Sequence, residues 1–361
     1  MGTIAVTSQL APLTSLSTPA LVVDLDVFEA NVAAMATLLR GTGKTIRPHV
    51  KTHRTPELAR RQLGGAAVGV TCATVGEAEA MVEAGIDDVL IANEVVDPRK
   101  IARLVALGRR ARIAVAVDDP EPVATLSVEA ARAGTTIDVL IDVDILLHRC
   151  GVPSAGDAVS LAQVIDRAPG VRLRGIMGYE GRLRLKDQDR AARIAQAYAT
   201  LAEARAALLD AGFPVEVVSS AGTSTVPDAL ANPIVTEVQA GVYALMEPEL
   251  LNLDLPFRCA VAIRGTVISR HPGRIVLDLG RRVVGMEYGA PVPVGFVATR
   301  IAISDEHATI HMADPLPALG SELDLAPGQI RTTFNLHDHV WVKRDGRLID
   351  RWPITARGSS Q

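Results

Sequence analysis

Eight short runs rich in β-branched residues alternate with amphipathic segments over the first two-thirds of the chain, and this alternation restricts the fold most strongly. Strand and helix alternating eight times predict a (β/α)8 TIM barrel of the α/β class. A doubly wound open sheet is the alternative, but no GxGxxG motif follows the early strands. Helices are predicted from an N-cap at Asp26 to a stop at Gly41, and over 189–212. We expect barrel strands at 45–50, 67–74, 88–93, 112–118, 136–144, 171–180, 215–222 and 236–245.

The pattern changes after about residue 250, where short strands follow one another without helices between them. Asp345 and Gly346 form a typical hairpin tip between two of these strands. This part of the chain therefore predicts an antiparallel β domain, which the early strand at 18–25 is expected to join. The expected division is a barrel over 26–248 and a β domain made of 1–25 plus 249–361.

Composition and charge exclude several classes of protein. The 361 residues are 48% hydrophobic but only 3% aromatic, so aliphatic side chains must fill a large core. A formal net charge of −4 offers no basic surface for nucleic acid or an anionic membrane. The three cysteines form no CxxC pair, which argues against structural zinc and a disulfide framework. Without a signal peptide pattern or a membrane-spanning run, we expect a cytoplasmic enzyme with a small-molecule substrate.

A lysine closes the first predicted barrel strand, in the sequence PHVKTH. Active sites of barrels lie at the carboxyl ends of the strands, which places Lys51 at the mouth of the barrel. A lysine partly withdrawn from water loses its proton more easily and can form an imine with a carbonyl compound. A salt bridge at the rim of the barrel is the alternative role for Lys51 taken alone.

The loops after the seventh and eighth strands suit a phosphate group. Barrels often bind phosphate there, and glycines let backbone N–H groups approach the phosphate oxygens. A lysine that can form an imine, together with a phosphate site, describes an enzyme of pyridoxal 5'-phosphate (PLP). The candidate phosphate-binding residues are Gly222 and Thr223 in SSAGTST, and Gly241, Val242 and Tyr243 in QAGVY.

Two more strand ends carry candidate catalytic residues. Arg149 follows the fifth strand in HRCGV, and Tyr179 follows the sixth in GYEG. An arginine there can stabilise the phenolate oxygen of PLP, and a tyrosine can pack on the ring or transfer a proton. A rim ion pair for Arg149 and a packed core ring for Tyr179 are the alternatives.

Eight segments in order along the chain resemble one family: RPHVKTHR, TCATVGEAEAM, IANEVV, HRCGV, GYEGR, SAGTST, EVQAGVYALM and NLHDHVWV. Over roughly 18–345 the chain resembles the D-threonine aldolase and D-serine dehydratase family of fold-type III PLP enzymes, relatives of alanine racemases. The resemblance implies that Lys51 carries PLP as a Schiff base and that Arg149 and Tyr179 contact the cofactor. It also implies phosphate contacts at Gly222, Thr223, Gly241 and Tyr243, and a homodimer.

The chain departs from this family at its metal site. The family pattern resembles PGHCDPTVNLHD, in which a His and a second ligand two residues later bind a divalent ion that holds the substrate's β-hydroxyl. The matching stretch here is PGQIRTTFNLHD, with Gln329 and Arg331 at the ligand positions. An amide is a weak ligand and a guanidinium repels a metal, so we expect the usual site to be absent. A relocated site at His337 and His339, which would share a face of a strand, is the alternative.

Three reactions on amino acids remain open. The first is aldol-type Cα–Cβ cleavage of a β-hydroxy-D-amino acid without the metal, and the second is racemisation or epimerisation. The third is a lyase reaction, either on an unusual substrate whose anionic group binds Arg331, with Gln329 as a further candidate for substrate binding, or the dehydration of a β-hydroxy amino acid. A PLP-binding protein without catalysis is a fourth interpretation, and the predicted β domain argues against it.

Overall fold

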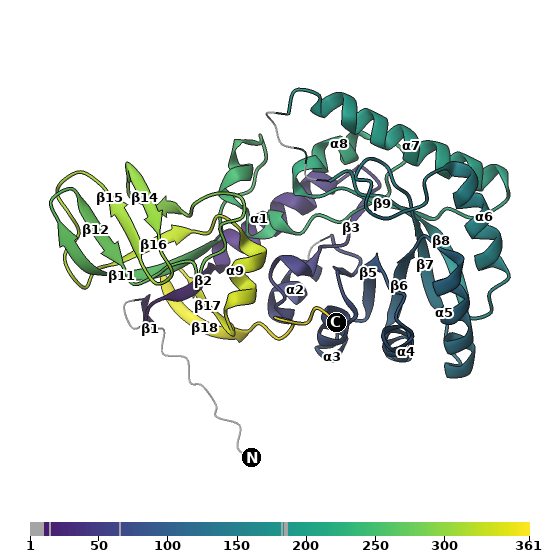
Figure 1. Cartoon of the computed structure of the whole chain (residues 1–361), viewed down its shortest axis with the longest axis horizontal. Helices are drawn as coiled ribbons and strands as arrows, with labels where there is room; N and C mark the ends of the chain where they lie inside the picture. Colours follow the sequence, from purple (N-terminus) through teal and green to yellow (C-terminus); the bar gives the residue numbers. More distant parts are fainter. Residues whose placement is uncertain (1–10, 14–15, 65, 182, 184–186) are drawn as a thin grey trace, which may run out of the picture. The chain divides into compact units, whose positions relative to one another are not determined.

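The computed structural model describes residues 11–13, 16–64, 66–181, 183 and 187–361, which are drawn in colour in Figure 1. The chain divides into two compact units, each with its own β-sheet. The barrel unit contains residues 35–51, 56–242 and 358–361, and the β unit contains the residues up to 34, 52–55 and 243–357. The division expected at residues 26 and 248 stays a prediction, and the two units are described separately.

The barrel unit contains eight parallel strands, which confirms the predicted fold class. They pair in the order β3-β10-β9-β8-β7-β6-β5-β4, and isolated parallel bridges of Ile46 with Ala67 and His49 with Thr71 join the two ends. One strand lies at each predicted run; most strands are shorter than expected, and β5 ends one residue later. The strands are β3 (Thr45–Ile46), β4 (Val70–Cys72), β5 (Asp88–Glu94), β6 (Arg112–Val117), β7 (Ile137–Asp142), β8 (Val171–Met177), β9 (Val217–Ser220) and β10 (Glu237–Val238).

Helices connect these strands, and polar residues fix where several of them begin. The side chains of Thr74, Asp97, Asp119 and Ser154 each accept a hydrogen bond from a backbone N–H in the first turn of the helix that follows. The helix expected over 189–212 is confirmed as α7 (Arg190–Asp210). The others are α2 (Pro56–Leu63), α3 (Val75–Glu83), α4 (Pro98–Leu107), α5 (Pro120–Ala133), α6 (Ala155–Asp166) and α8 (Val226–Ala231).

The first helix corrects one sequence prediction. Helix α1 (Leu25–Leu39) begins earlier than expected, and Oδ1 of Asp24 accepts the N–H of Val27 at 3.1 Å. Asp24 therefore caps the helix, and Asp26 lies within its first turn. The sequence DLD offers two acidic residues with the same capping chemistry, and the last residue of strand β2 (Ala20–Asp24) takes this role.

The β unit has the predicted sheet with one difference. Its main path runs β1-β18-β17-β2-β11-β12-β15-β14, and β16 pairs with β11 and β13. All pairs are antiparallel except β2 with β17, so the early strand pairs in parallel with β17 and antiparallel with β11. The hairpin tip at Asp345 and Gly346 is confirmed, with φ angles of 48° and 70°. The remaining strands are β1 (Ala11–Pro12), β11 (Val261–His271), β12 (Arg274–Leu277), β13 (Val292–Val294), β14 (Arg300–Ile303), β15 (Ala308–His311), β16 (Glu322–Ala326), β17 (His339–Arg344) and β18 (Arg347–Pro353).

A helix interrupts the strands of the β unit where the sequence predicted none. Helix α9 (Ile330–Leu336) follows β16, and His337 is its C-cap. The expectation that His337 and His339 share a face of one strand is therefore wrong, because only His339 belongs to β17. The side chains of Ile330 and Phe334, which are four residues apart, are both fully buried, and this burial favours the helix over an extended segment.

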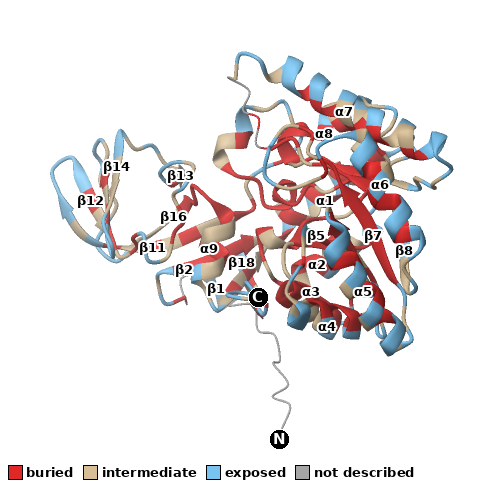
Figure 2. Cartoon of the chain, turned by 45° about the vertical axis from the view of Figure 1, so that its right-hand side comes forward, coloured by how far each residue is buried: buried red, intermediate tan, exposed pale blue. Residues whose placement is uncertain are grey.

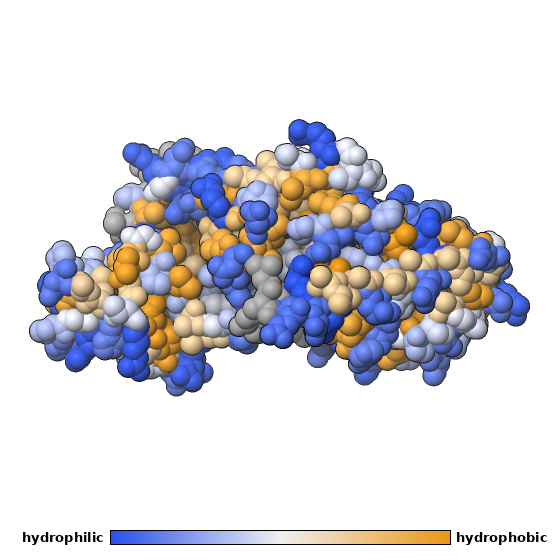
Figure 3. Space-filling model, turned by 90° about the horizontal axis from the view of Figure 1, so that it is seen from above, coloured by the Kyte–Doolittle hydropathy of each residue, from blue (hydrophilic) through white to orange (hydrophobic). Residues whose placement is uncertain are grey.

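Aliphatic side chains fill the interior of both units, as the low aromatic content requires. Figure 2 shows the buried residues concentrated in the sheets and on the inner faces of the helices, and every residue of β7 is buried. On the face seen in Figure 3, polar and apolar residues are interspersed. No helix in the described part of the chain is long and apolar enough to cross a membrane.

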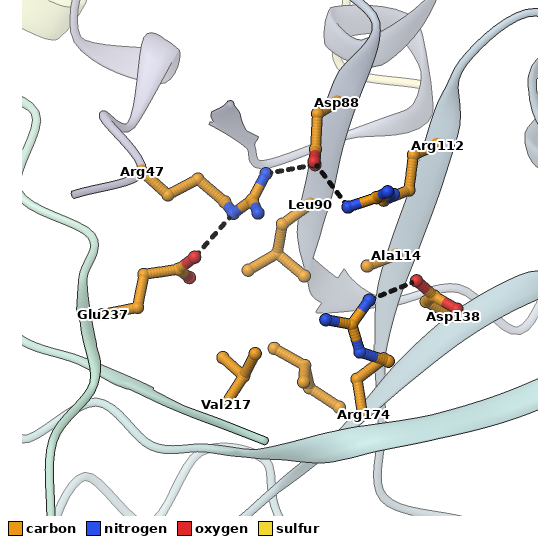
Figure 4. A pocket seen from close by; sticks show the side chains of 10 residues that line it. Arg47, Asp88, Leu90, Arg112, Ala114, Asp138, Arg174, Val217 and Glu237 are labelled. Carbon is orange, nitrogen blue, oxygen red and sulfur yellow. Dashed lines mark hydrogen bonds and ion pairs between the residues drawn. The ribbon is translucent and has the colours of Figure 1, made fainter. Parts of the chain in front are cut away.

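A network of charged side chains lies near the amino ends of the barrel strands (Figure 4). Arg47 Nη1 lies 2.5 Å from Asp88 Oδ1, and Arg47 Nε lies 3.0 Å from Glu237 Oε2. Arg174 binds Asp138 in the same pocket, at 3.1 Å. Each guanidinium in Figure 4 has an acidic partner, so the network joins strands and leaves no charge for a ligand. In barrels this end contributes to stability.

Replacing Arg47 by Met should lower the free energy of unfolding by about 3 kcal/mol, because Asp88 and Glu237 lose a largely buried partner. The Arg47 side chain is only 13% exposed. Arg112→Met is the matched control, since Arg112 approaches the same Asp88 but is 61% exposed, and it should cost less than about 1 kcal/mol. Urea denaturation of both variants measures the difference, and equal losses would contradict this account of the network.

Candidate active site

Two of the predicted catalytic residues line one pocket at the carboxyl end of the barrel. Arg149 and Tyr179 come from the segments after β7 and β8. Because these strands are neighbours in the parallel sheet, their following loops meet at the same edge. The remaining lining residues are Asp142, Val143, Asp144, Leu147 and Cys150.

The loop that carries Arg149 is tied back onto β7. The N–H of Val152 donates to the carbonyl of Asp142 at 2.9 Å, and the N–H of Asp144 donates to the carbonyl of Val152 at 3.1 Å. Oδ1 of Asp144 accepts the N–H of His148 at 2.9 Å. These bonds return the chain to the strand end within a few residues, so that Arg149 projects there with an exposed side chain.

Gly151 allows this loop to close. Its φ angle is +103°, and a Cβ at this position would lie 2.5 Å from the Asp144 nitrogen. Its N–H donates to Oδ2 of Asp118, after β6, at 2.9 Å. A residue with a side chain would be strained here by both its backbone angle and this contact. The glycine of HRCGV thus places Arg149 and Cys150 beside the neighbouring strand end.

Tyr179 meets the first predicted phosphate loop. A Cβ built on Gly222 would lie 3.4 Å from Cε2 and 3.5 Å from Oη of Tyr179. Gly222 opens the loop after β9, and its neighbour Thr223 begins a 3₁₀ turn, Thr223–Thr225. The absence of a side chain at Gly222 therefore leaves a narrow space between the tyrosine ring and the start of this turn.

Glu180 joins these two segments, and the sequence analysis missed it. Its side chain is 1% exposed and accepts hydrogen bonds from the hydroxyls of Thr225 and, at 3.3 Å, Ser220. Burial raises the pKa of the Glu180 carboxyl, and these hydrogen bonds oppose the rise. A glutamate directly after the candidate Tyr179, in GYEG, was the available signal. It fixes the loop after β8 against the loop after β9.

The second predicted phosphate loop follows β10. Strands β9 and β10 pair in parallel, and Gln239 Nε2 donates to Oγ of Ser219 at 3.0 Å, so the two loops start side by side. Gly241 and Val242 belong to the barrel unit. Tyr243 belongs to the β unit, where its ring is 1% exposed and lies 5.5 Å from that of Phe257.

Lys51 lies where the sequence predicted, just beyond the first barrel strand. It belongs to the 3₁₀ turn Val50–Thr52 and is half-buried. The bridge between His49 and Thr71 extends the sheet up to this turn. Lys51 and the loops after β7, β8, β9 and β10 thus follow strands of the same closed sheet at their carboxyl ends.

Three carboxyl groups lie close together near Arg149. The sequence analysis did not select them. They belong to Glu94, Asp118 and Asp142, at the ends of β5, β6 and β7. Burial of Asp142, followed by the charges of Glu94 and Asp118, raises its pKa to about 8, and the nearby Arg149 opposes this rise. Burial and Glu94 also raise the pKa of the Cys150 thiol to about 11, so this cysteine stays protonated at neutral pH.

The same region holds a group with metal-ligand atoms. Glu94, Asp118 and Cys150 each place one such atom within 4.8 Å of the others, and no other group of three is found among the described residues. Acidic clusters of this kind are common without an ion. Asp118 already accepts a hydrogen bond from Gly151, and the cationic Arg149 follows in the same loop.

The two residues at the family's metal positions make contacts of a different kind. Oε1 of Gln329 caps α9 by accepting the N–H of Thr332 at 2.9 Å. Arg331 Nη2 lies 3.5 Å from Oε1 of the fully buried Glu247, and its guanidinium lies 5.4 Å from the centre of the Tyr288 ring. A capping amide and a paired guanidinium do not form a donor set for a divalent ion, so these residues do not fit the family's metal.

The alternative histidines have separate partners. Nε2 of His337 lies 2.8 Å from the carbonyl oxygen of Val283, and burial lowers the pKa of His337. The His339 ring lies edge-on to Trp341, with centroids 5.6 Å apart. Neither histidine belongs to a group of three metal-ligand side chains in the described ranges.

Comparison with known proteins places this architecture in a family. Residues 23–247 match the alanine racemase N-terminal domain, and residues 260–343 match a putative serine dehydratase domain. The chain is 38% identical to D-threonine aldolase of Arthrobacter sp, over 97% of this chain and 95% of that protein. It is 33% identical to 3-hydroxy-D-aspartate aldolase of Paracoccus denitrificans (strain Pd 1222), over 95% and 92%.

The crystal structure of D-threonine aldolase from Filomicrobium marinum has the same fold, with a TM-score of 0.93 and 38% identity. The match covers 98% of this chain and all of that chain. Both halves of the sequence thus agree with one set of relatives, and the fold agrees along the whole chain. The chain therefore belongs to the D-threonine aldolase and D-serine dehydratase family, with an alanine racemase-type barrel.

Proposed function

We propose that this protein is a PLP-dependent lyase that cleaves or forms the Cα–Cβ bond of β-hydroxy-D-amino acids. The observation that carries the proposal is the likeness to D-threonine aldolase over nearly the full length of both chains. The 3-hydroxy-D-aspartate aldolase relative points to the same bond and configuration. The positions of Lys51 and of the candidate phosphate loops, which all follow barrel strands, also support a PLP enzyme.

The barrel unit offers groups that fit PLP. Gly222 leaves a space beside Tyr179 that a Cβ would fill, and Thr223 adds a hydroxyl at the start of the same loop. Gly241 and Val242 follow the adjacent strand and supply backbone N–H groups for the phosphate. We assign the phosphate to these residues and to Tyr243, and the carbonyl carbon of the cofactor to Nζ of Lys51.

Bound PLP would supply an electron-withdrawing ring that weakens the bonds at the substrate's Cα. Three residues of this chain would act around the bound cofactor. Nζ of Lys51 holds the cofactor and accepts or returns a proton. Arg149, on a loop tied to β7, would supply a positive charge to the phenolic oxygen of the ring. Oη of Tyr179 transfers a proton at the substrate, in a position set by Gly222 and Glu180.

We further propose that the reaction proceeds without a divalent ion at the family's position. Gln329 and Arg331 replace the ligands, and each has a partner of its own in the β unit. We assign both to substrate binding. A guanidinium suits a carboxylate, which 3-hydroxy-D-aspartate carries on its β-carbon and D-threonine does not. A side chain rather than a metal-held oxygen must then accept the proton of the β-hydroxyl.

A dehydratase is the second candidate, because residues 260–343 match a putative serine dehydratase domain. It would release ammonia and a keto acid instead of glycine and an aldehyde. Racemisation through Lys51 and Tyr179 would leave the carbon skeleton intact. A homodimer and a cytoplasmic location stay predictions from the sequence.

Aldehyde release from D-threonine and 3-hydroxy-D-aspartate tests the proposed reaction. With PLP and excess EDTA, we expect glycine and aldehyde at a rate within about twofold of that with added Mn²⁺, since the family ligands are replaced. Lys51→Ala should reduce the rate by at least about 10³-fold, and Lys100→Ala on α4 serves as the matched control. Keto acid and ammonia would establish the dehydratase, and a rate restored only by Mn²⁺ would refute metal independence.

Exchange of Arg331 tests its assignment to substrate. Arg331→Met should raise KM for 3-hydroxy-D-aspartate about tenfold or more and change KM for D-threonine less than about threefold. Arg331→Lys keeps the charge and should give an intermediate value. Because the buried Glu247 loses its cationic partner and keeps only its other contacts, such as the N–H of Ile330, thermal unfolding of each variant is measured in parallel. Equal effects on both substrates would show that Arg331 only supports the fold.

A further inference from the structure

The turn after β9 contains a backbone conformation that depends on its surroundings. Ala221 joins the strand to this turn with a φ angle of +72°, in the left-handed region. A residue with a Cβ is disfavoured there and keeps the conformation where neighbouring contacts hold it. The next residue, Gly222, has a φ angle of −96°, which any residue adopts. The alanine and not the glycine thus occupies the strained position, so the shape of the turn depends on the contacts around it.

Hydrogen bonds that begin at Glu180 hold this turn. Oγ1 of Thr225 donates to the carboxyl of Glu180 and accepts the N–H of Gly222 at 3.1 Å. The same hydroxyl lies 3.2 Å from the carbonyl oxygen of Gly222, but the carboxyl is the closer acceptor. The N–H of Gly222 also opposes the rise in the pKa of Glu180, so this carboxyl lies close to the backbone of the turn. The hydroxyl of Thr225 thus connects a buried carboxyl to the backbone of Gly222.

This connection sets the direction of a backbone donor. The N–H of Thr225 donates to the carbonyl of Gly222 at 3.1 Å, so this carbonyl points toward Thr225. The peptide bond between Gly222 and Thr223 is trans, and a trans peptide directs its C=O and N–H to opposite sides. The N–H of Thr223 therefore points away from Thr225. Backbone N–H groups in a turn bind anions, so the position of Thr225 affects the loop that we assign to phosphate.

Other contacts attach the same segment to the barrel unit. Nη2 of Arg190, on α7, donates to the carbonyl of Ser224 at 2.8 Å. Oγ of Ser220 donates to the carbonyl of Gly178 at 2.8 Å and joins the end of β9 to the end of β8. A variant without the Glu180 carboxyl keeps these contacts, so we expect it to fold with a less ordered turn.

We propose that Glu180 is a positioning residue for the phosphate of the cofactor. It acts through Thr225, which it holds in the place that directs the backbone donors of the turn at the phosphate. The inference rests on the proposed function, because it takes the turn after β9 as part of the phosphate site. It follows that the Glu180 carboxyl strengthens the binding of the phosphate group and contributes little to the binding of the rest of the cofactor.

Binding of PLP and of pyridoxal, which lacks the phosphate, tests this proposal without relying on activity. Both compounds carry the aldehyde that reacts with Lys51, so absorption titration of the cofactor-free protein gives a dissociation constant for each. Glu180→Met keeps the volume of the side chain but has no oxygen to accept from Thr225. It should raise the dissociation constant about tenfold or more for PLP and less than about twofold for pyridoxal.

Glu180→Gln is the matched conservative variant. Its amide oxygen accepts from Thr225, and its Nε2 donates to Ser220, whose own hydroxyl donates to Gly178. It should therefore bind PLP within about threefold of the wild type. Thr225→Val removes the hydroxyl and should resemble Glu180→Met, and the double variant should lose little more than either single variant, because both changes break the same connection.

Asp138→Asn is the control for general loss of stability. It weakens a buried ion pair at the amino ends of the strands and should change neither dissociation constant, even where it lowers the unfolding temperature. Equal losses for PLP and pyridoxal in Glu180→Met would overturn the proposal, since Glu180 would then only support the fold. Unchanged PLP binding in Glu180→Met refutes this inference alone. A wild type that binds PLP no better than pyridoxal refutes the phosphate site of the proposed function.

Discussion

Two backbone bridges, Ile46 with Ala67 and His49 with Thr71, close the parallel sheet of the barrel unit on itself. In a closed parallel sheet the carboxyl ends of all strands face one side. Residues as distant in sequence as Lys51, Arg149, Tyr179 and Gly222 therefore share that side. The closed sheet fixes the strand ends, and the short loops after the strands then position the site residues. Hydrogen bonds to a buried or neighbouring carboxylate hold these loops in place. Asp118 holds the loop of Arg149, and Glu180 holds those of Tyr179 and Gly222.

The opposite ends of the same strands are fixed by charge. Arg47 joins β5 and β10 through Asp88 and Glu237, and Arg174 on β8 binds Asp138 on β7. With Arg112, which approaches Asp88, three arginines balance three carboxylates at this end, whereas the carboxyl ends collect an excess of acidic groups around Asp142. The barrel thus separates a balanced network that stabilises the sheet from an unbalanced cluster beside the proposed cofactor. Unbalanced buried charge is typical of functional positions.

Strand periodicity and strand-end position were sufficient to predict the barrel, the β unit, and the places of Lys51, Arg149, Tyr179 and Gly222 along the chain. Their roles rest on the family resemblance and stay proposals. Glu180 was missed although it directly follows Tyr179 in GYEG. Glu94 and Asp142 could not be selected, because an acidic residue at a strand end is common and its burial depends on contacts across the sheet. Helix α9 was missed for a related reason. This seven-residue helix lies between strands β16 and β17. Only the burial of both Ile330 and Phe334, four residues apart, indicates that the segment is a helix and not a strand. Asp24 and Asp26 offered the same cap, and tertiary context decided between them.

The central claim is that Lys51 carries PLP in this barrel. Reduction of the PLP-loaded enzyme with borohydride, followed by peptide mass mapping, tests it directly because reduction makes the lysine linkage permanent. The account predicts one phosphopyridoxyl group per chain, on the peptide that contains Lys51. A label on Lys44 or Lys100, or no label on a protein that retains aldehyde release, would contradict it.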